Sequence, residues 1–224
     1  MNQVMSYAQG LRFIKENRLS SIRRLPAESR SSYWLKKDEI ERYLGAIAPW
    51  RGDGADPQKV RNFAEFLVWT GARIGEGLLF NTRDIDWTRR EIRLITFKKK
   101  RKRSKEAVYR YLTIDGLGPR FVSLLSKLKG HPTTGYFFAG QHGKPFPYPW
   151  LRAKLVAGAR KAGIEWFRSH DSRHTFAMHR AIIVKDFRQL QMELGHEDPV
   201  SVQSYLDNTA RFRPEDSIFQ KGAA

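Results

Sequence analysis

Glu91-Ile-Arg-Leu-Ile-Thr-Phe97 and Val108-Tyr-Arg-Tyr-Leu-Thr-Ile114 are two short runs rich in β-branched and aromatic residues, and a basic stretch from Lys98 to Lys105 separates them. Such runs are typical of strands, so we expect a β-hairpin with a long basic loop. Asp84-Ile-Asp-Trp-Thr88, which precedes the first run, is turn-like.

Outside this hairpin the apolar residues follow helical spacing. Val60, Phe63, Ala64 and Leu67 show it most clearly, and that helix should end near Thr70-Gly71. The other expected helices span about 3–17, 36–48, a segment starting close to 72, 121–128, 151–162, 170–184, 187–194 and 200–206, with 136–150 as an irregular connection. The sequence therefore predicts a mainly α fold with one small antiparallel β-sheet (α+β).

The charge balance limits the class of partner. The 224 residues contain 41 Lys plus Arg against 23 Asp plus Glu, a net charge of +18. A polyanion, first of all nucleic acid, is the expected partner. A basic membrane-surface protein is a minor alternative, because no apolar run reaches the length of a spanning helix. The chain has no cysteine and no signal-peptide pattern at its start, so we expect a cytoplasmic protein without thiol chemistry.

Four motifs carry candidate chemistry. Thr70-Gly-Ala-Arg-Ile-Gly-Glu76 places Arg73 near a helix start, where a phosphate can bind, and Glu76 one turn later can fix the guanidinium. Alone, Arg73 is more simply a solvated charge. The basic run can grip phosphates through Lys99, Lys100, Arg101, Lys102 and Arg103, or deliver one lysine into a cleft.

The other two motifs lie in the C-terminal third. Ser169-His-Asp-Ser-Arg-His-Thr-Phe-Ala177 places His170 and Arg173 on one helix face. His174 receives no direct role, because its neighbours Phe176 and Ala177 are typical of a core-facing surface. Leu194-Gly-His196 is followed nine positions later by Tyr205, which by itself is more simply a packing residue.

Taken together and in this order, the motifs resemble those of the tyrosine recombinases, the phage integrase and Xer-type family. The resemblance covers about residues 33–210 and implies the catalytic-domain fold of that family. It implies that the chain is a site-specific recombinase or integrase, that Tyr205 attacks a DNA phosphorus to give a 3′-phosphotyrosine, and that no metal or other cofactor takes part.

The resemblance also assigns the remaining roles. Arg73 and Arg173 would bind the non-bridging phosphate oxygens. His170 and His196 would orient the phosphate and assist proton transfer, and which one is the base stays open. A hairpin lysine would protonate the leaving 5′-oxygen; Lys98 aligns best, with Lys99 and Lys100 as rivals.

Family members carry a core-binding domain ahead of the catalytic domain. Residues 1–32 are expected to be the last helix of such a domain plus a linker, residues 33–210 the catalytic domain, and residues 211–224 a C-terminal tail. Double-stranded DNA is the implied partner, bound by a homo-oligomer that is tetrameric in a full recombinase. Two alternatives stay open: a type IB topoisomerase that relaxes supercoils, and a DNA-binding regulator without catalysis.

Overall fold

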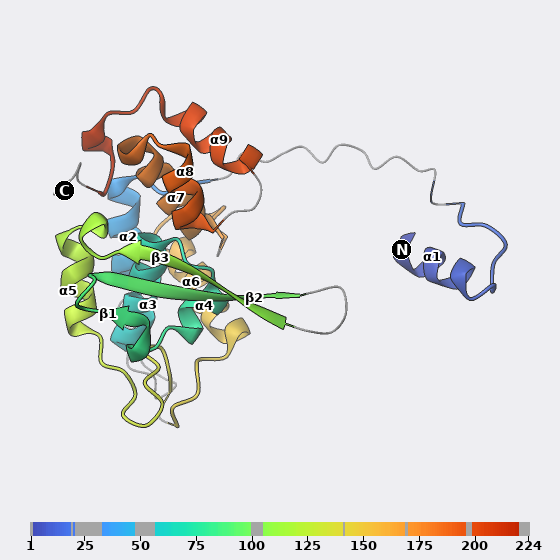
Figure 1. Ribbon diagram of the computed structural model, residues 1–224, viewed down its shortest axis with the longest axis horizontal. Coiled ribbons are helices and arrows are strands. Elements are labelled where there is room, and N and C mark those ends of the chain that lie inside the picture. The colour runs from blue at the N-terminus through green and yellow to red at the C-terminus, as the bar shows by residue number, and fades with distance from the viewer. Residues whose placement is uncertain are drawn as a thin grey trace. The chain divides into compact units, whose positions relative to one another are not determined.

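The computed structural model describes residues 2–18, 20, 33–47, 57–99, 105–140, 142–168, 170–195 and 199–219 (Figure 1). The chain divides into two compact units, residues 1–32 and 33–224. In the first unit, helix α1 spans Asn2–Gly10, shorter than the expected 3–17, and the Asn17 amide donates to Ser6 Oγ over 2.9 Å. All other elements belong to the second unit.

The sheet of the second unit has three antiparallel strands in the order β1-β2-β3. They are β1 (Ile85–Asp86), β2 (Glu91–Lys99) and β3 (Lys105–Thr113), with Ile92 opposite Leu112 and Lys98 opposite Glu106. The expected hairpin is confirmed. Two details were wrong: both strands extend into the basic stretch, and the turn-like segment before β2 contains the two-residue strand β1.

Helices line one side of this sheet and gather above it (Figure 1). Those in the first part of the unit are α2 (Lys37–Ile47), α3 (Pro57–Thr70), α4 (Ile74–Leu79), α5 (Pro119–Lys127) and α6 (Tyr148–Lys161). Short 3-10 helices span Thr82–Asp84, Asp115–Leu117 and Pro214–Asp216. The helix expected at 151–162 begins earlier, at Tyr148, because Pro147 and Pro149 suit the first positions of a helix.

The C-terminal helices are α7 (Asp171–Val184), α8 (Phe187–Leu194) and α9 (Pro199–Thr209). Helix α7 packs against α3, α8 and α9, and α8 packs against β3. Residues on most of the circumference of α7 are buried, as expected for a helix enclosed by its neighbours. The α7 backbone is therefore fixed from several sides.

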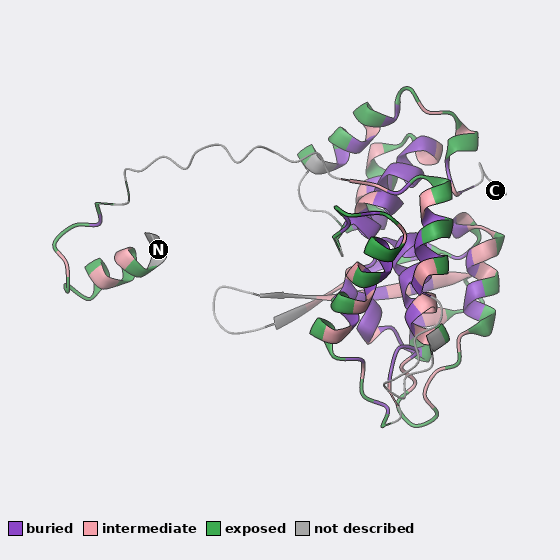
Figure 2. Ribbon diagram, turned by 180° about the vertical axis from the view of Figure 1, so that it is seen from behind, coloured by how far each residue is buried: buried purple, intermediate pink, exposed green. Residues whose placement is uncertain are grey.

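Aromatic rings form much of the core around α3. Phe66 contacts Phe80 and Phe138 at centroid distances of 4.6 and 5.4 Å, and Phe63 contacts Phe138 edge-on at 4.8 Å. Buried residues run continuously through the second unit (Figure 2). Fully burying each such ring stabilises a fold by roughly 1.5–3 kcal/mol.

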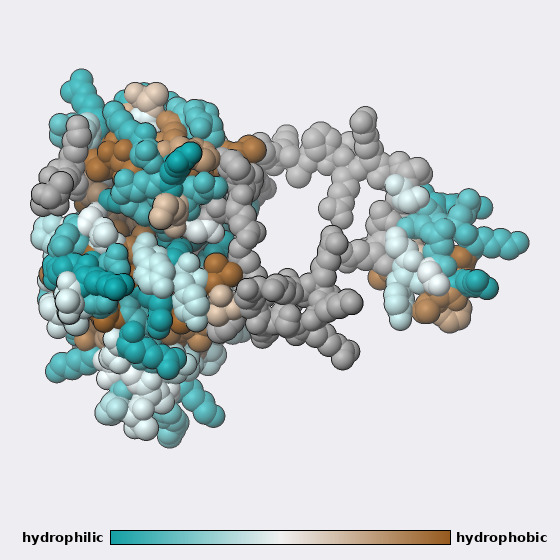
Figure 3. All heavy atoms as spheres, in the orientation of Figure 1, coloured by the Kyte–Doolittle hydropathy of each residue, from teal (hydrophilic) through white to brown (hydrophobic). Residues whose placement is uncertain are grey.

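The segment after α9 packs onto α7 of the same chain. Phe219 is buried against the ring of Phe176 at 5.7 Å, and Ser217 Oγ donates to the His179 carbonyl over 2.7 Å. The face of the second unit seen in Figure 3 is largely hydrophilic. In the parts of the chain that the structure describes, no helix has both the length and the apolar character needed to cross a bilayer.

Candidate active site

Arg73 stands at the start of α4 and is tied to Glu76. It is the residue immediately before the first helical residue, Ile74. Its backbone N–H donates to Glu76 Oε2 over 3.0 Å, and its guanidinium donates to Oε1 over 2.7 Å. The Arg73 side chain is 40% exposed whereas that of Glu76 is 2% exposed. The buried carboxylate thus holds an accessible guanidinium at a helix N-terminus, where anions bind favourably.

Glu76 is the centre of a wider network. Arg110 donates to Glu76 Oε2 over 3.0 Å, and the Thr96 hydroxyl donates to Oε1. Burial raises the pKa of this carboxyl, but the Arg110 charge and the Thr96 hydrogen bond outweigh it and lower the pKa to about 2. The structure therefore places Glu76 in direct contact with Arg73, where the sequence predicted a supporting residue.

Arg110 is a site residue that sequence reasoning missed. It lies on β3, donates to the Thr70 carbonyl over 3.2 Å and to the Glu193 carbonyl, and is buried. Burial lowers the pKa of its guanidinium, opposed by Glu76. A signal was present, because Arg110 shares strand parity with the buried Leu112 and therefore occupies a core-facing position.

Arg173 lies on α7 and is 1% exposed. It donates to the Gly71 carbonyl over 2.8 Å and to the Leu194 carbonyl. Burial, then the charges of Arg110 and Arg73, lower the pKa of Arg173 to about 9. Two glycine-containing motifs thus supply backbone acceptors that fix this guanidinium.

Gly71 is required at this point for two reasons. Its φ of 59° is left-handed, and a Cβ there would lie 2.5 Å from the Phe176 ring. Any larger residue would push α3 away from α7 and displace the carbonyl that holds Arg173. Gly71, in the first motif, therefore positions Arg173, in the third.

His170 precedes α7 and is exposed at the surface. Partial desolvation, then the charges of Arg173 and Arg73, lower its pKa. It lines a cleft of about 370 Å³ together with Arg73, Ile74, Gly75, Glu76, Leu79, Ile95, Thr96 and Tyr148. The cleft thus joins a guanidinium, the carboxylate that holds it, a histidine and apolar groups, as in a pocket with a few convergent polar groups.

Tyr205 lies on α9 with its hydroxyl against α7. His174 Nδ1 is 2.6 Å from Tyr205 Oη, and the rings of His170 and His174 meet edge-on at 5.2 Å. Tyr205 is 6% exposed, and burial raises its pKa although the Arg173 charge lowers it. His174, to which the sequence gave no direct role, is thus the residue in contact with the expected nucleophile.

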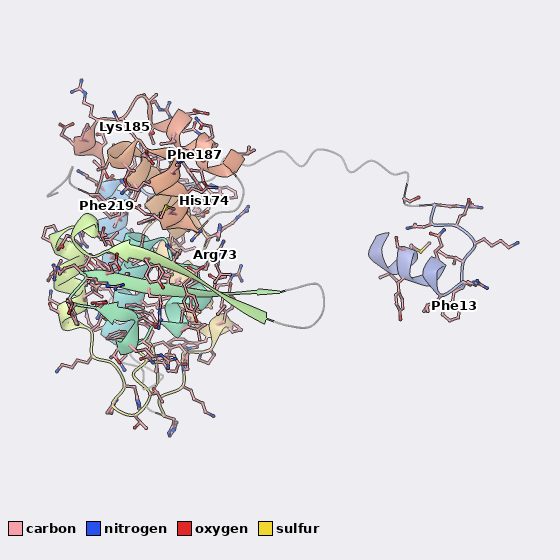
Figure 4. The ribbon with its side chains drawn as sticks, viewed as in Figure 1. Phe13, Arg73, His174, Lys185, Phe187 and Phe219 are labelled. Carbon is pink, nitrogen blue, oxygen red and sulfur yellow. The ribbon has the colours of Figure 1, made fainter. Side chains whose placement is uncertain are left out.

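The described site residues form one connected group, at the boundary between the sheet and the C-terminal helices where Figure 4 shows Arg73 and His174. Arg73 and His170 share the cleft, His170 touches His174, and His174 touches Tyr205. The structure therefore brings Arg73, Glu76, His170, Arg173 and Tyr205 together.

The remaining predicted residues are described in part or not at all. The backbones of Lys98 and Lys99 form the end of β2. Lys100, Arg101, Lys102, Arg103 and His196 lie outside the described residues. Among the residues that are described, no three His, Asp or Glu side chains gather as ligands for a metal ion.

Comparison with known proteins supplies the family. The model of the phage integrase family matches residues 33–211. The chain belongs to the phage integrase family. The expected resemblance and its mainly α fold with a small sheet are thereby confirmed.

Individual relatives are distant and longer. The tyrosine recombinase XerD of Corynebacterium glutamicum is 31% identical over 186 residues, 79% of this chain and 57% of the relative. The tyrosine recombinase XerC of Roseiflexus castenholzii is 28% identical over 159 residues, 66% of this chain and 48% of the relative. The chain thus spans about half the length of the curated relatives it matches.

Solved structures share the fold. A lambda integrase dimer bound to a COC′ core site has a TM-score of 0.62 at 18% identity, covering 89% of this chain and 70% of the other. The XerH site-specific recombinase bound to palindromic difH substrate has a TM-score of 0.58 at 19% identity, covering 80% of this chain and 51% of the other. At such identities the likeness concerns the fold alone.

Proposed function

We propose that this phage integrase family chain cleaves and rejoins DNA as a site-specific recombinase, with Tyr205 as the nucleophile and a 3′-phosphotyrosine intermediate. The observation that carries the proposal is the contact of the Tyr205 hydroxyl with His174. Burial raises the pKa of this hydroxyl and the positive charge of Arg173 lowers it, and His170, whose ring meets that of His174, lines the cleft together with Arg73. A tyrosine that only packs in the core needs no such surroundings. A nucleophilic tyrosine needs them, because a free phenol has a pKa of about 10 and little of it is ionised at neutral pH.

The two arginines bind the scissile phosphate in this proposal. Arg73 is accessible in the cleft, and the buried Arg173 is fixed by two backbone carbonyls. Both are pre-positioned by other contacts, so little reorganisation is needed when charge develops on the non-bridging oxygens. His170, exposed beside them, orients the same phosphate. His196 shares that role by its motif.

Lys98 is the proposed acid for the leaving 5′-oxygen. Residues two apart on a strand share a face, so Lys98 falls on the face of β2 that carries Thr96, which contacts Glu76 in the site. Lys99 falls on the opposite face. The register thus favours Lys98 over Lys99, while Lys100 to Arg103 are proposed to contact the DNA backbone.

The relatives suggest how the whole protein works. XerC and XerD are named tyrosine recombinases, and solved neighbours are bound to DNA. We propose that the partner is double-stranded DNA in the cytoplasm, and that the protein binds it as a homo-oligomer, with a tetrameric synapse for full recombination. Residues 1–32 are proposed to be the end of a core-binding domain, residues 33–210 the catalytic domain and residues 211–224 the tail. No cofactor is proposed, because the phosphotyrosine conserves the energy of the broken bond.

Covalent capture tests the proposal. A pool of randomised duplexes, each nicked so that the short 5′-hydroxyl fragment diffuses away after cleavage, is incubated with the protein and run on a denaturing gel. Wild type should give a covalent protein–DNA band and Tyr205→Phe none. Equal absence of the band from both proteins, across the pool, contradicts the proposal.

Two other functions make different predictions. A type IB topoisomerase would relax a supercoiled plasmid without joining two sites, whereas a recombinase exchanges strands between two copies of the captured sequence. A regulator without catalysis would bind DNA and give no covalent band. The His174–Tyr205 contact favours an enzyme over a regulator, since binding alone needs no activated hydroxyl.

A further inference from the structure

We propose that His174 is the base that accepts the Tyr205 proton during DNA cleavage. The inference rests on the proposed function and names a catalytic group that the motif comparison does not supply. Its basis is geometric: His174 Nδ1 lies 2.6 Å from Tyr205 Oη, a distance typical of a strong hydrogen bond.

The direction of this hydrogen bond follows from the protonation states. Burial, then the charges of His170 and Arg173, lower the pKa of His174 to about 4, so its ring is neutral at neutral pH. A neutral imidazole has one nitrogen that accepts, and the phenol is the donor. Nδ1 therefore accepts from Tyr205, and the ring proton of His174 is on Nε2.

A neutral histidine of such low pKa becomes a better base when DNA binds. A phosphodiester held by Arg73 and Arg173 places a negative charge beside His174, and an adjacent negative charge raises the pKa of a histidine. At the same time the phenol becomes more acidic as its oxygen bonds to phosphorus. The two changes bring donor and acceptor closer in proton affinity, as efficient proton transfer requires.

The other histidines are placed for different work. His170 touches the His174 ring and lines the phosphate cleft beside Arg73, and no bond between His170 and Tyr205 is present in the described residues. Its surface position suits phosphate orientation. His196 lies outside the described residues, so a His196 variant belongs in the test.

Two proton transfers accompany cleavage. The Tyr205 Oη–P bond forms, the P–O5′ bond breaks, and the Oη proton passes to His174 Nδ1. The departing O5′ takes a proton from the hairpin lysine. Religation reverses both transfers, so His174 returns its proton to Tyr205.

The test measures the rate of covalent-band formation on the captured nicked duplex. His174→Asn keeps a side-chain oxygen near the Nδ1 position but takes up no proton at neutral pH, and we expect it to slow cleavage about 100-fold. Its rate should rise about tenfold per pH unit above pH 7 as solvent removes the proton, whereas the wild-type rate stays flatter. Imidazole should partly restore His174→Gly. His142→Asn, at an exposed histidine away from the cleft, should retain the wild-type rate.

A second substrate distinguishes loss of the base that accepts the Tyr205 proton from loss of the acid that protonates the leaving oxygen. In a 5′-bridging phosphorothiolate the leaving thiolate needs no proton, so this substrate should restore Lys98→Ala and leave His174→Asn slow. His196→Asn is measured beside them, and a pH profile parallel to that of wild type is expected for it. Wild-type behaviour of His174→Asn, or its rescue by the phosphorothiolate, overturns the inference while the wild-type band and the proposed function stand. Absence of the wild-type band overturns both.

The hydrogen bond is also measurable without DNA. In ¹⁵N-histidine spectra at pH 7, His174 Nδ1 should be the unprotonated nitrogen, and Tyr205→Phe should shift its resonance while His142 is unchanged. A protonated Nδ1 on His174 would overturn the inference independently of any DNA substrate.

Discussion

At the residue scale, one buried carboxylate organises the cations of the site. Glu76 contacts Arg73 and Arg110, and its charge also acts on Arg173. A charged arginine as buried as Arg110 is costly without a partner of opposite charge. The first motif therefore carries a buried counterion beside Arg73, the proposed phosphate ligand.

Glu76→Gln should accordingly destabilise the fold. The amide keeps the shape but removes the carboxylate that pairs with the buried Arg110, and removing one partner of a buried pair costs about 3–5 kcal/mol in the free energy of unfolding. Denaturant unfolding at pH 7 measures this. Asp115→Asn, which removes an exposed and solvent-screened pair with Arg90, should change the free energy of unfolding far less. Equal values for both variants would show that Glu76 is dispensable.

A site residue could be predicted from the sequence where its role depends on a local motif, and not where it depends on how two helices pack. Arg73, Arg173 and Tyr205 could be proposed because short motifs keep their spacing along the chain. His174 was set aside because its neighbours Phe176 and Ala177 are buried, as the structure confirms. Its contact with Tyr205 depends on how α9 crosses α7, and no local pattern encodes that crossing.

At the scale of elements, α7 joins the two ends of the second unit through His179. His179 Nε2 bonds the Leu35 carbonyl over 2.9 Å, and the Ile218 N–H donates to Nδ1 over 3.3 Å. Both ring nitrogens are therefore used, and the neutral ring carries its proton on Nε2. Burial, opposed by the Leu35 carbonyl, lowers the pKa of His179 to about 4.

This arrangement predicts a loss of stability in mild acid. Between pH 6.5 and 4 the unfolded chain protonates this histidine and the folded chain does not, so the free energy of unfolding should fall by about 3 kcal/mol through His179 as the pH falls. His179→Gln keeps a donor for Leu35 but has no such titration. Unfolding curves of the two proteins should converge as the pH drops from 6.5 to 4; a constant difference between them would contradict the prediction.

Helices and strands were predictable to different degrees. Periodicity located α3, α8 and the hairpin because their apolar residues recur at regular spacing, although the C-terminal half of α3 is buried on all sides. Strand β1 was missed because two residues show no periodicity, and its position depends on pairing with β2. The strand ends were misplaced because lysines are poor strand signals, although pairing with the partner strand continues through Lys98 and Lys99.

At the scale of the whole molecule, the net charge of +18 favours binding to a polyanion through many phosphate contacts. If six to ten phosphates are neutralised, affinity for duplex DNA should fall roughly 10³- to 10⁵-fold between 50 and 200 mM salt. Filter binding or fluorescence anisotropy measures the slope. Arg101→Ala should lower the slope by about one, as expected for one lost phosphate contact.

Lys127→Ala is the matched control for the hairpin variant. Lys127 is exposed in the last turn of α5, outside the basic stretch that joins β2 and β3. Its removal changes the net charge by the same amount as Arg101→Ala. An equal effect of both variants on the salt slope would argue for diffuse attraction in place of a hairpin contact.

The most direct measurement is the chemical identity of the captured protein–DNA link. The covalent band is digested with protease and nuclease, and the modified peptide is sequenced by mass spectrometry. The peptide that contains Tyr205 should carry the 3′-phosphate of the cleaved strand, with a free 5′-hydroxyl on the released fragment. A link to another residue, or to a 5′-phosphate, would contradict Tyr205 as the nucleophile.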